Sequence, residues 1–106
     1  MENLGLIKED IDKIKAVFSH YEQVEEVLIY GSRAKGTYKP ASDIDLTLIG
    51  DNIDLSLQLK IEFELDDLML PYRFDITIFR TIENPSFIEH ITRVGKIFHK
   101  NIKSSN

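Results

Sequence analysis

Residues 31–36 of the chain read Gly-Ser-Arg-Ala-Lys-Gly, and residues 42–46 read Ser-Asp-Ile-Asp-Leu. The first stretch follows the apolar run of residues 27–30, which is typical of a buried strand. The second opens a run over residues 43–49 that indicates another strand, closed by a Gly-Asp-Asn turn signal. Because Gly, Thr, Pro and Ser dominate the stretch between them, we expect a strand, a turn region and a second strand here.

Helices and strands alternate on both sides of this unit. Apolar residues at steps of four and three, from Ile7 to Tyr21, predict an amphipathic helix. Residues 74–79 predict a third strand, and Asn84-Pro85 with a capping box over 86–89 predicts a helix that ends at Gly95. Residues 97–98 indicate a last short strand. The order predicts an α/β domain.

Residues 55–65 carry two opposed signals. Apolar and polar residues alternate strictly, which favours a strand, whereas the abundance of Leu, Gln, Lys and Glu favours a helix. As a helix, the segment would be apolar on two sides, which suits a helix covered on both. We expect a helix, either wholly in the core or with one side forming a partner surface.

Length and composition limit the possibilities further. The 106 residues, 42% of them hydrophobic, suit one domain over residues 1–99 followed by a polar tail over residues 100–106. The absence of cysteine excludes a disulfide scaffold and cysteine-based zinc sites. A net charge of −5 argues against direct nucleic-acid binding, because each phosphate contact needs a cation. We find no signal peptide and no apolar run long enough for a membrane span, so a cytoplasmic protein is expected.

Gly31 and Ser32 lie where the first strand runs into a tight turn and a short helix. Glycine lets the backbone approach a phosphate closely, and the free amides of the helix point at the anion. Ser32 adds a hydroxyl donor, while Arg33 and Lys35 could offset triphosphate charge. An ordinary turn carrying two solvated cations would give the same residues.

Asp43 and Asp45 would share one face of the second strand, with Cα atoms about 6.7 Å apart. Two carboxylates on one face repel each other unless a cation lies between them, and this spacing suits a pair of divalent ions about 3.5–4 Å apart. Oxygen ligands favour magnesium or manganese over zinc. A solvated strand edge is the alternative.

Asp75 is the acidic residue inside the third strand, on the face that also carries Thr77 and Phe79. It would be costly there unless it binds a metal or pairs with Arg73 or Arg80. Asp66 and Asp67, at the end of the expected helix, are lower-ranked candidates for a third carboxylate. Tyr30 and Tyr38 flank the site, and we expect Tyr30 in the core and Tyr38 facing solvent.

Gly31-Ser32, ten intervening residues and Asp43-x-Asp45 resemble the signature of the DNA polymerase β-like nucleotidyltransferase superfamily. The two stretches resemble its minimal nucleotidyltransferases, known as MNT domains, over nearly the whole chain. The resemblance implies a mixed sheet of about four strands flanked by helices, with ATP as substrate and Mg²⁺ (two ions, Mn²⁺ possible) as cofactor. It also implies that Asp43, Asp45 and Asp75 are the catalytic, metal-binding residues.

The same resemblance implies nucleotide binding by Gly31 and Ser32, with less defined roles for Arg33 and Lys35. Many MNT proteins are antitoxins encoded beside a HEPN-domain ribonuclease. The resemblance therefore implies that this chain transfers AMP to a tyrosine hydroxyl of such a toxin. A HEPN toxin is therefore the expected partner. Two alternatives stay open: a non-catalytic antitoxin that neutralises its partner by occlusion, and nucleotidyl transfer to a small molecule.

Overall fold

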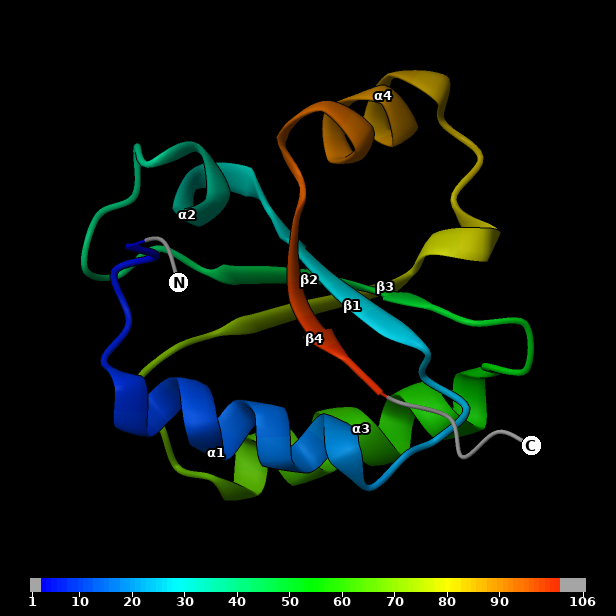
Figure 1. Ribbon diagram of the computed structural model, residues 1–106, viewed down its shortest axis with the longest axis horizontal. Helices are drawn as coiled ribbons and strands as arrows, with labels where there is room; N and C mark the ends of the chain where they lie inside the picture. The colour runs from blue at the N-terminus through cyan, green and yellow to red at the C-terminus, as the bar shows by residue number, and fades with distance from the viewer. Residues whose placement is uncertain (1–2, 102–106) are drawn as a thin grey trace.

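The structure, a computed structural model, describes residues 3–101 and consists of a single sheet with helices on both faces (Figure 1). Its elements are, in chain order, α1 (Lys8–Ser19), β1 (Glu26–Tyr30), α2 (Gly31–Lys35), β2 (Ile44–Ile49), α3 (Leu55–Asp67), β3 (Phe74–Ile78), the 3₁₀ helix η1 (Phe79–Thr81), α4 (Pro85–Val94) and β4 (Lys96–Lys100). The alternation of helices and strands predicted from the sequence is confirmed. None of the helices in the described part is long and apolar enough to cross a membrane.

The four strands lie in the order β3-β2-β1-β4. β1 pairs antiparallel with both β2 and β4, whereas β2 and β3 are parallel and are joined through α3. The sheet is therefore mixed, as the family resemblance implied. Parallel strands need a crossover connection, and α3 supplies it.

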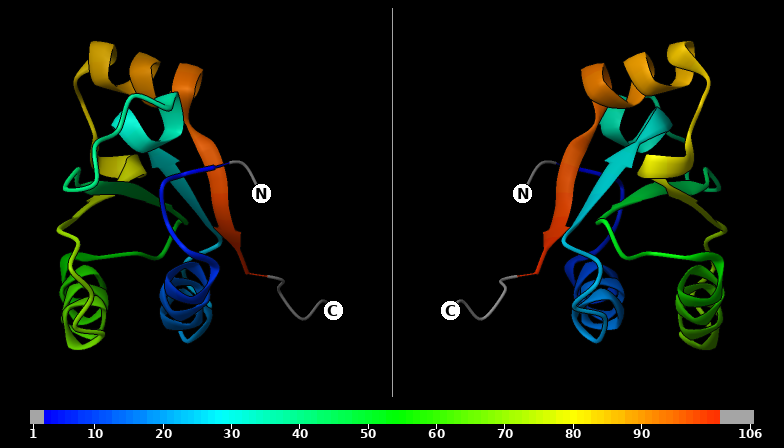
Figure 2. Two further views of the ribbon diagram at one scale, coloured as in Figure 1. Left: turned by 90° about the vertical axis from the view of Figure 1, so that its left-hand side faces the viewer. Right: turned by 90° about the vertical axis from the view of Figure 1, so that its right-hand side faces the viewer.

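The helices form two layers, one on each face of the sheet (Figure 2). α1 and α3 cover one face, and α2 and α4 lie on the other. Side chains alternate along each strand, so every second residue of β1, β2 and β3 points toward α1 and α3. The buried strand residues of this core are Val27, Ile29, Ile44, Leu46, Leu48, Ile76 and Ile78, together with Phe98 of β4. The opposite face is free to carry polar residues.

The ambiguous segment is a helix, as composition favoured. Asp54 caps it, accepting a hydrogen bond from the Leu57 amide at 2.9 Å. The residues that alternate in sequence divide between two sides of the helix, because each step of two turns the side chain by about 200°. Three of them, Leu57, Ile61 and Leu65, are buried in the core, and another three, Leu55, Leu59 and Phe63, are exposed.

Several boundaries differ from the sequence prediction. Phe79, predicted as the end of the third strand, is the first residue of η1. α4 is capped by Asn84, whose side chain accepts from the amides of Ser86 and Phe87, so the helix begins before the predicted capping box. β4 continues through Lys100, and the Asn101 amide donates to three main-chain carbonyls at the end of α1 and beyond it. The polar tail predicted from Lys100 therefore begins later. Its residues 102–106 lie outside the described part.

Candidate functional site

A row of polar side chains crosses the sheet on the face opposite the α1–α3 core. Tyr30 on β1 is the register partner of Asp45 on β2, and Asp45 is in turn the partner of Asp75 on β3. Residues paired in this way point to the same face. Neighbouring strands lie about 4.8 Å apart, so the structure brings the two carboxylates side by side. The alternative explanation of Asp75, an ion pair with Arg73 or Arg80, is not found within residues 3–101.

The next row of the same face consists of Thr47 and Thr77. The Thr77 hydroxyl donates to the Thr47 hydroxyl at 2.8 Å, and Thr47 is fully buried. This pair forms a polar floor next to the two aspartates. Sequence reasoning placed Thr77 on the face of Asp75 but missed Thr47, although alternation from Asp45 puts it there.

The candidate phosphate-binding turn at Gly31 lies directly beside the carboxylate of Asp45. Its φ of +73° is a left-handed conformation that side chains disfavour, and a Cβ built there would lie 2.2 Å from Oδ2 of Asp45. The backbone at the start of α2 thus contacts the Asp45 carboxylate directly. Ser32 follows in the first turn of this short helix, as predicted. An anion bound at Gly31 and Ser32 would lie next to a cation bound at Asp45.

Negative charge accumulates at Asp45. Burial raises the pKa of its carboxyl to about 6, and the charges of Asp75 and Asp43 add to the increase, while the cation of Arg33 opposes it. Asp43 lies in the loop just before β2, not on the strand as predicted, and it is exposed. A bound cation would relieve this repulsion.

The donor chemistry of the site fits a hard divalent ion. Asp45 and Asp75 offer adjacent carboxylates, and Asp43 is close enough to influence Asp45. Within residues 3–101, no three acidic or histidine side chains are already gathered closely enough to hold a metal ion. Asp43, in its exposed loop before β2, is the third candidate ligand beside these two carboxylates.

The structure does not support the prediction that Arg33 contacts a bound nucleotide. It is 1% exposed, and all five of its N–H groups point at main-chain carbonyls: Nη1 at Leu4 and Gly5, Nη2 at Pro40 and Ser42, and Nε also at Ser42, at 2.8–3.3 Å. The rings of Tyr38 and Tyr72 lie 5.4 and 5.2 Å from the guanidinium carbon. No donor is left for a phosphate. Arg33 instead fixes the loop that leads into Asp43.

Lys35 has the opposite character. It is the last residue of α2 and is exposed. Of the two cations predicted to contact the nucleotide, only Lys35 has an exposed side chain.

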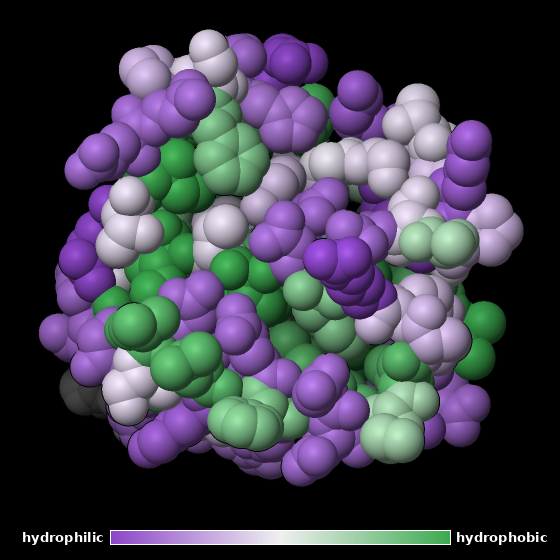
Figure 3. Space-filling view, turned by 180° about the vertical axis from the view of Figure 1, so that it is seen from behind, coloured by the Kyte–Doolittle hydropathy of each residue, from purple (hydrophilic) through white to green (hydrophobic). Residues whose placement is uncertain are grey.

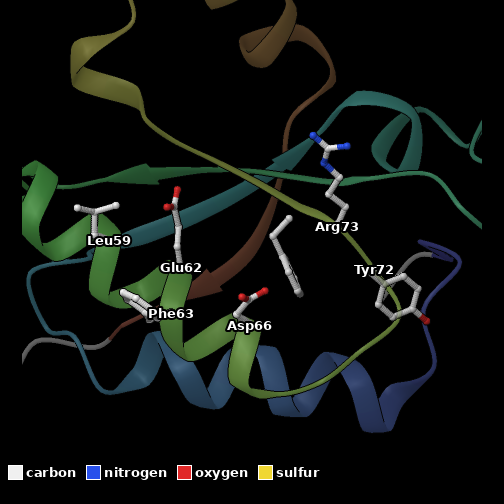
Figure 4. Close-up of a pocket in the computed structure, with 7 residues that line it drawn as sticks. Leu59, Glu62, Phe63, Asp66, Tyr72 and Arg73 are labelled. Atoms are coloured by element: carbon white, nitrogen blue, oxygen red, sulfur yellow. The ribbon is translucent and has the colours of Figure 1, made fainter.

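A cavity of about 620 Å³ lies away from these residues (Figure 4). Its lining comes from α3 and from the segment that leads into β3: Leu59, Glu62, Phe63, Asp66, Tyr72, Arg73 and Phe74. Seen from behind, apolar side chains gather along the lower part of this face, where α3 lies (Figure 3). α3 packs on the core face of the sheet, so Asp66 and Asp67 are on the wrong side to join Asp45.

Comparison with known proteins agrees with this geometry. The sequence profile of the family described as "Polymerase beta, Nucleotidyltransferase" matches residues 12–103. The chain belongs to this nucleotidyltransferase family. A Methanocaldococcus jannaschii protein named "Putative protein adenylyltransferase MJ1217" is 33% identical over 86 residues, covering 80% of the chain and 87% of that relative.

Solved structures share the nucleotidyltransferase fold. A toxin–antitoxin complex with AMP-PNP has a TM-score of 0.68 at 19% identity, covering 83% of this chain and 71% of that one. The complex of a tri-AMPylated Shewanella oneidensis HEPN toxin with an MNT antitoxin has a TM-score of 0.63 at 15% identity, covering 86% and 70%. At these identities the likeness establishes the fold.

Proposed function

We propose that this nucleotidyltransferase transfers AMP from ATP to a tyrosine hydroxyl of a HEPN toxin and so acts as its antitoxin. The observation that carries the proposal is the contact between Gly31 and Asp45, beside Asp75. This contact supports the proposal because the candidate anion-binding turn at the start of α2 lies beside two carboxylates. Nucleotidyl transfer needs this combination, because a polyphosphate and its cations must be held together.

In this proposal Asp43, Asp45 and Asp75 would hold two Mg²⁺ ions, with Mn²⁺ as a substitute. When bound, the ions would supply charge neutralisation of the triphosphate and a lower pKa for the attacking hydroxyl. Gly31 and Ser32 would bind the β- and γ-phosphates through their amides and the serine hydroxyl, and Lys35 would add a mobile cation.

The transfer step is a single displacement at the α-phosphorus. The tyrosine oxygen forms a bond to that phosphorus, the bond to the β-phosphate oxygen breaks, and pyrophosphate leaves. Asp75 is exposed on the open edge strand and would accept the proton of the attacking hydroxyl. Its lack of an ion pair among the described residues leaves its carboxylate free for this role.

The acceptor is inferred from the relatives. The curated relative is named as a protein adenylyltransferase, and one fold neighbour is a complex with an AMPylated HEPN toxin. These names support a protein acceptor over a small molecule.

The test is a transfer assay with purified partner, ATP and Mg²⁺, comparing the wild type with Asp43→Asn and Asp45→Asn. We expect both variants to fold and to lose transfer. Unchanged transfer would overturn the metal assignment. Variants that cannot transfer AMP but still silence the toxin would instead favour occlusion, and a modified small molecule with an unmodified toxin would favour the third alternative.

A further inference from the structure

The hydroxyl of Tyr30 is buried without a partner. The residue is 4% exposed, and its oxygen makes no hydrogen bond to any group in the described part of the chain. Leaving a buried hydroxyl unpaired destabilises a folded protein, because the group loses its hydrogen bonds to water. A buried polar atom of this kind needs an explanation, and a missing ligand is one of them.

The surroundings of Tyr30 place this hydroxyl in the site. The side chain shares the row of Asp45 and Asp75 on the open face of the sheet. Its ring is held edge-on by Phe87 and His90 of α4, with centroids 5.5 and 6.1 Å away. The ring therefore has little freedom to turn its hydroxyl elsewhere.

The hydroxyl is a donor under ordinary conditions. A phenolic hydroxyl carries one proton and can donate one hydrogen bond. The neighbouring Thr77 hydroxyl does not meet the geometry of a hydrogen bond with it. Thr77 directs its own hydrogen bond to Thr47. The Tyr30 hydroxyl can therefore donate a hydrogen bond to an acceptor that binds at this row.

We propose that the Tyr30 hydroxyl donates a hydrogen bond to an oxygen atom of the bound nucleotide–metal complex, at the row formed with Asp45 and Asp75. The oxygen belongs either to the polyphosphate or to a water molecule on the metal ion. This inference rests on the proposed function and adds a nucleotide-binding residue to it. It assigns the aromatic residue before Gly31 a role besides core packing.

The proposal predicts opposite effects of one substitution on stability and on binding. Tyr30→Phe removes an unpaired hydroxyl, so the ligand-free protein should keep or raise its melting temperature. The same variant should bind the nucleotide more weakly, by about fivefold to tenfold, which is the effect of one hydrogen bond. If Tyr30 only packed in the core, the substitution would not weaken nucleotide binding while leaving the melting temperature unchanged or higher.

Tyr21→Phe is the matched control. The Tyr21 hydroxyl donates to Glu64 at 2.5 Å, between the end of α1 and α3, on the other face of the sheet. Losing this satisfied, charge-assisted bond should lower the melting temperature and leave nucleotide affinity unchanged. The two tyrosines thus give opposite patterns for the same chemical change.

The experiment is calorimetric titration of the three proteins with a non-hydrolysable ATP analogue, with Mg²⁺ and again with EDTA, alongside thermal unfolding without ligand. A loss of affinity for Tyr30→Phe in both titrations identifies a polyphosphate oxygen as the acceptor. A loss only with Mg²⁺ identifies a metal-bound water.

Two results overturn the inference alone. One is wild-type affinity in Tyr30→Phe while the wild type binds the analogue, and the other is a fall in melting temperature like that of Tyr21→Phe. A wild-type protein that binds no analogue, with or without Mg²⁺, overturns the proposed function and this inference together.

Discussion

Gly31 is the residue at which the backbone of the site leaves no space for a side chain. A Cβ there would overlap the Asp45 carboxylate, whereas a Cβ at Gly36, which has a similar positive φ, would meet nothing within 4 Å. We expect Gly36→Ala to cost about 1 kcal/mol of backbone strain and to leave nucleotide affinity intact. Gly31→Ala should cost more and abolish nucleotide binding. Chemical unfolding and analogue titration measure both, and equal effects of the two substitutions would contradict the assigned contact.

Arg33 and Lys35 lie on the same short helix and differ in burial. Arg33→Ala should lower the free energy of unfolding by about 3–5 kcal/mol, because a buried guanidinium is lost and the carbonyls it contacts lose their donor. Lys35→Ala should change stability by less than about 0.5 kcal/mol and weaken nucleotide binding. Urea unfolding and titration of the two variants separate these roles. Normal stability in Arg33→Ala would show that its hydrogen bonds are dispensable.

The raised pKa of Asp45 predicts how the free energy of unfolding depends on pH. Its folded pKa of about 6 exceeds its usual value of 3.8, so the folded state binds the proton more tightly. This contribution to stability is complete below about pH 4 and is lost as pH rises through about 6. Without metal, Asp45→Asn should therefore be more stable than the wild type at pH 7, by about 1 kcal/mol after allowance for solvent screening. This difference in the free energy of unfolding should disappear at pH 4. Urea unfolding at both pH values measures it, and the same difference at pH 4 and pH 7 would contradict the assignment to charge repulsion.

At the scale of the element, α3 shows how the fold resolves a mixed pattern. Ile61 is fully buried, whereas Phe63, two residues later, is 75% exposed. In a strand the two would share a face. Ile61→Ala should cost about 2–5 kcal/mol, and Phe63→Ala less than about 0.5 kcal/mol. Urea unfolding of both variants measures these losses of stability. Similar losses would contradict the burial of Ile61 and the exposure of Phe63.

Much of the architecture could be predicted because its signals are local. The apolar runs and the turn glycines are visible in sequence, and they predicted the strands. The same-strand pairing of Asp43 with Asp45 was wrong, because Asp43 lies in the loop before β2. Alternation also placed Asp75 and Thr77 on one face. The start of α4 at Asn84-Pro85 was predicted, whereas the capping box over residues 86–89 lies inside the helix, because Asn84 and Ser86 are both good capping residues.

The role of Arg33 could not be predicted in this way. A basic residue beside a phosphate-binding turn suits either an anion or a set of carbonyls, and the carbonyls come from residues 4–5 and 40–42, which only the folded chain brings together. The lack of a hydrogen-bond partner for the Tyr30 hydroxyl also could not be predicted, because it depends on which side chains from distant parts of the chain pack on this face of the sheet. Long-range packing decides both.

At the scale of the whole molecule, the two faces of the sheet have separate tasks. The face toward α1 and α3 is an apolar core, and the opposite face carries the carboxylates, the threonine pair and Tyr30. The apolar residues that form the core are therefore different from the polar residues of the candidate site. We expect substitutions such as Asp45→Asn to remove activity without unfolding the chain.

The central claim is that this chain transfers AMP to its partner protein. Intact-mass spectrometry of the HEPN partner, after incubation with the chain, ATP and Mg²⁺, tests it most directly. We predict a gain of about 329 Da, or a multiple of it, on the partner, and none with Asp45→Asn in place of the wild type. An unmodified partner that is nevertheless silenced in a stable complex would contradict the claim and show that this protein neutralises by occlusion.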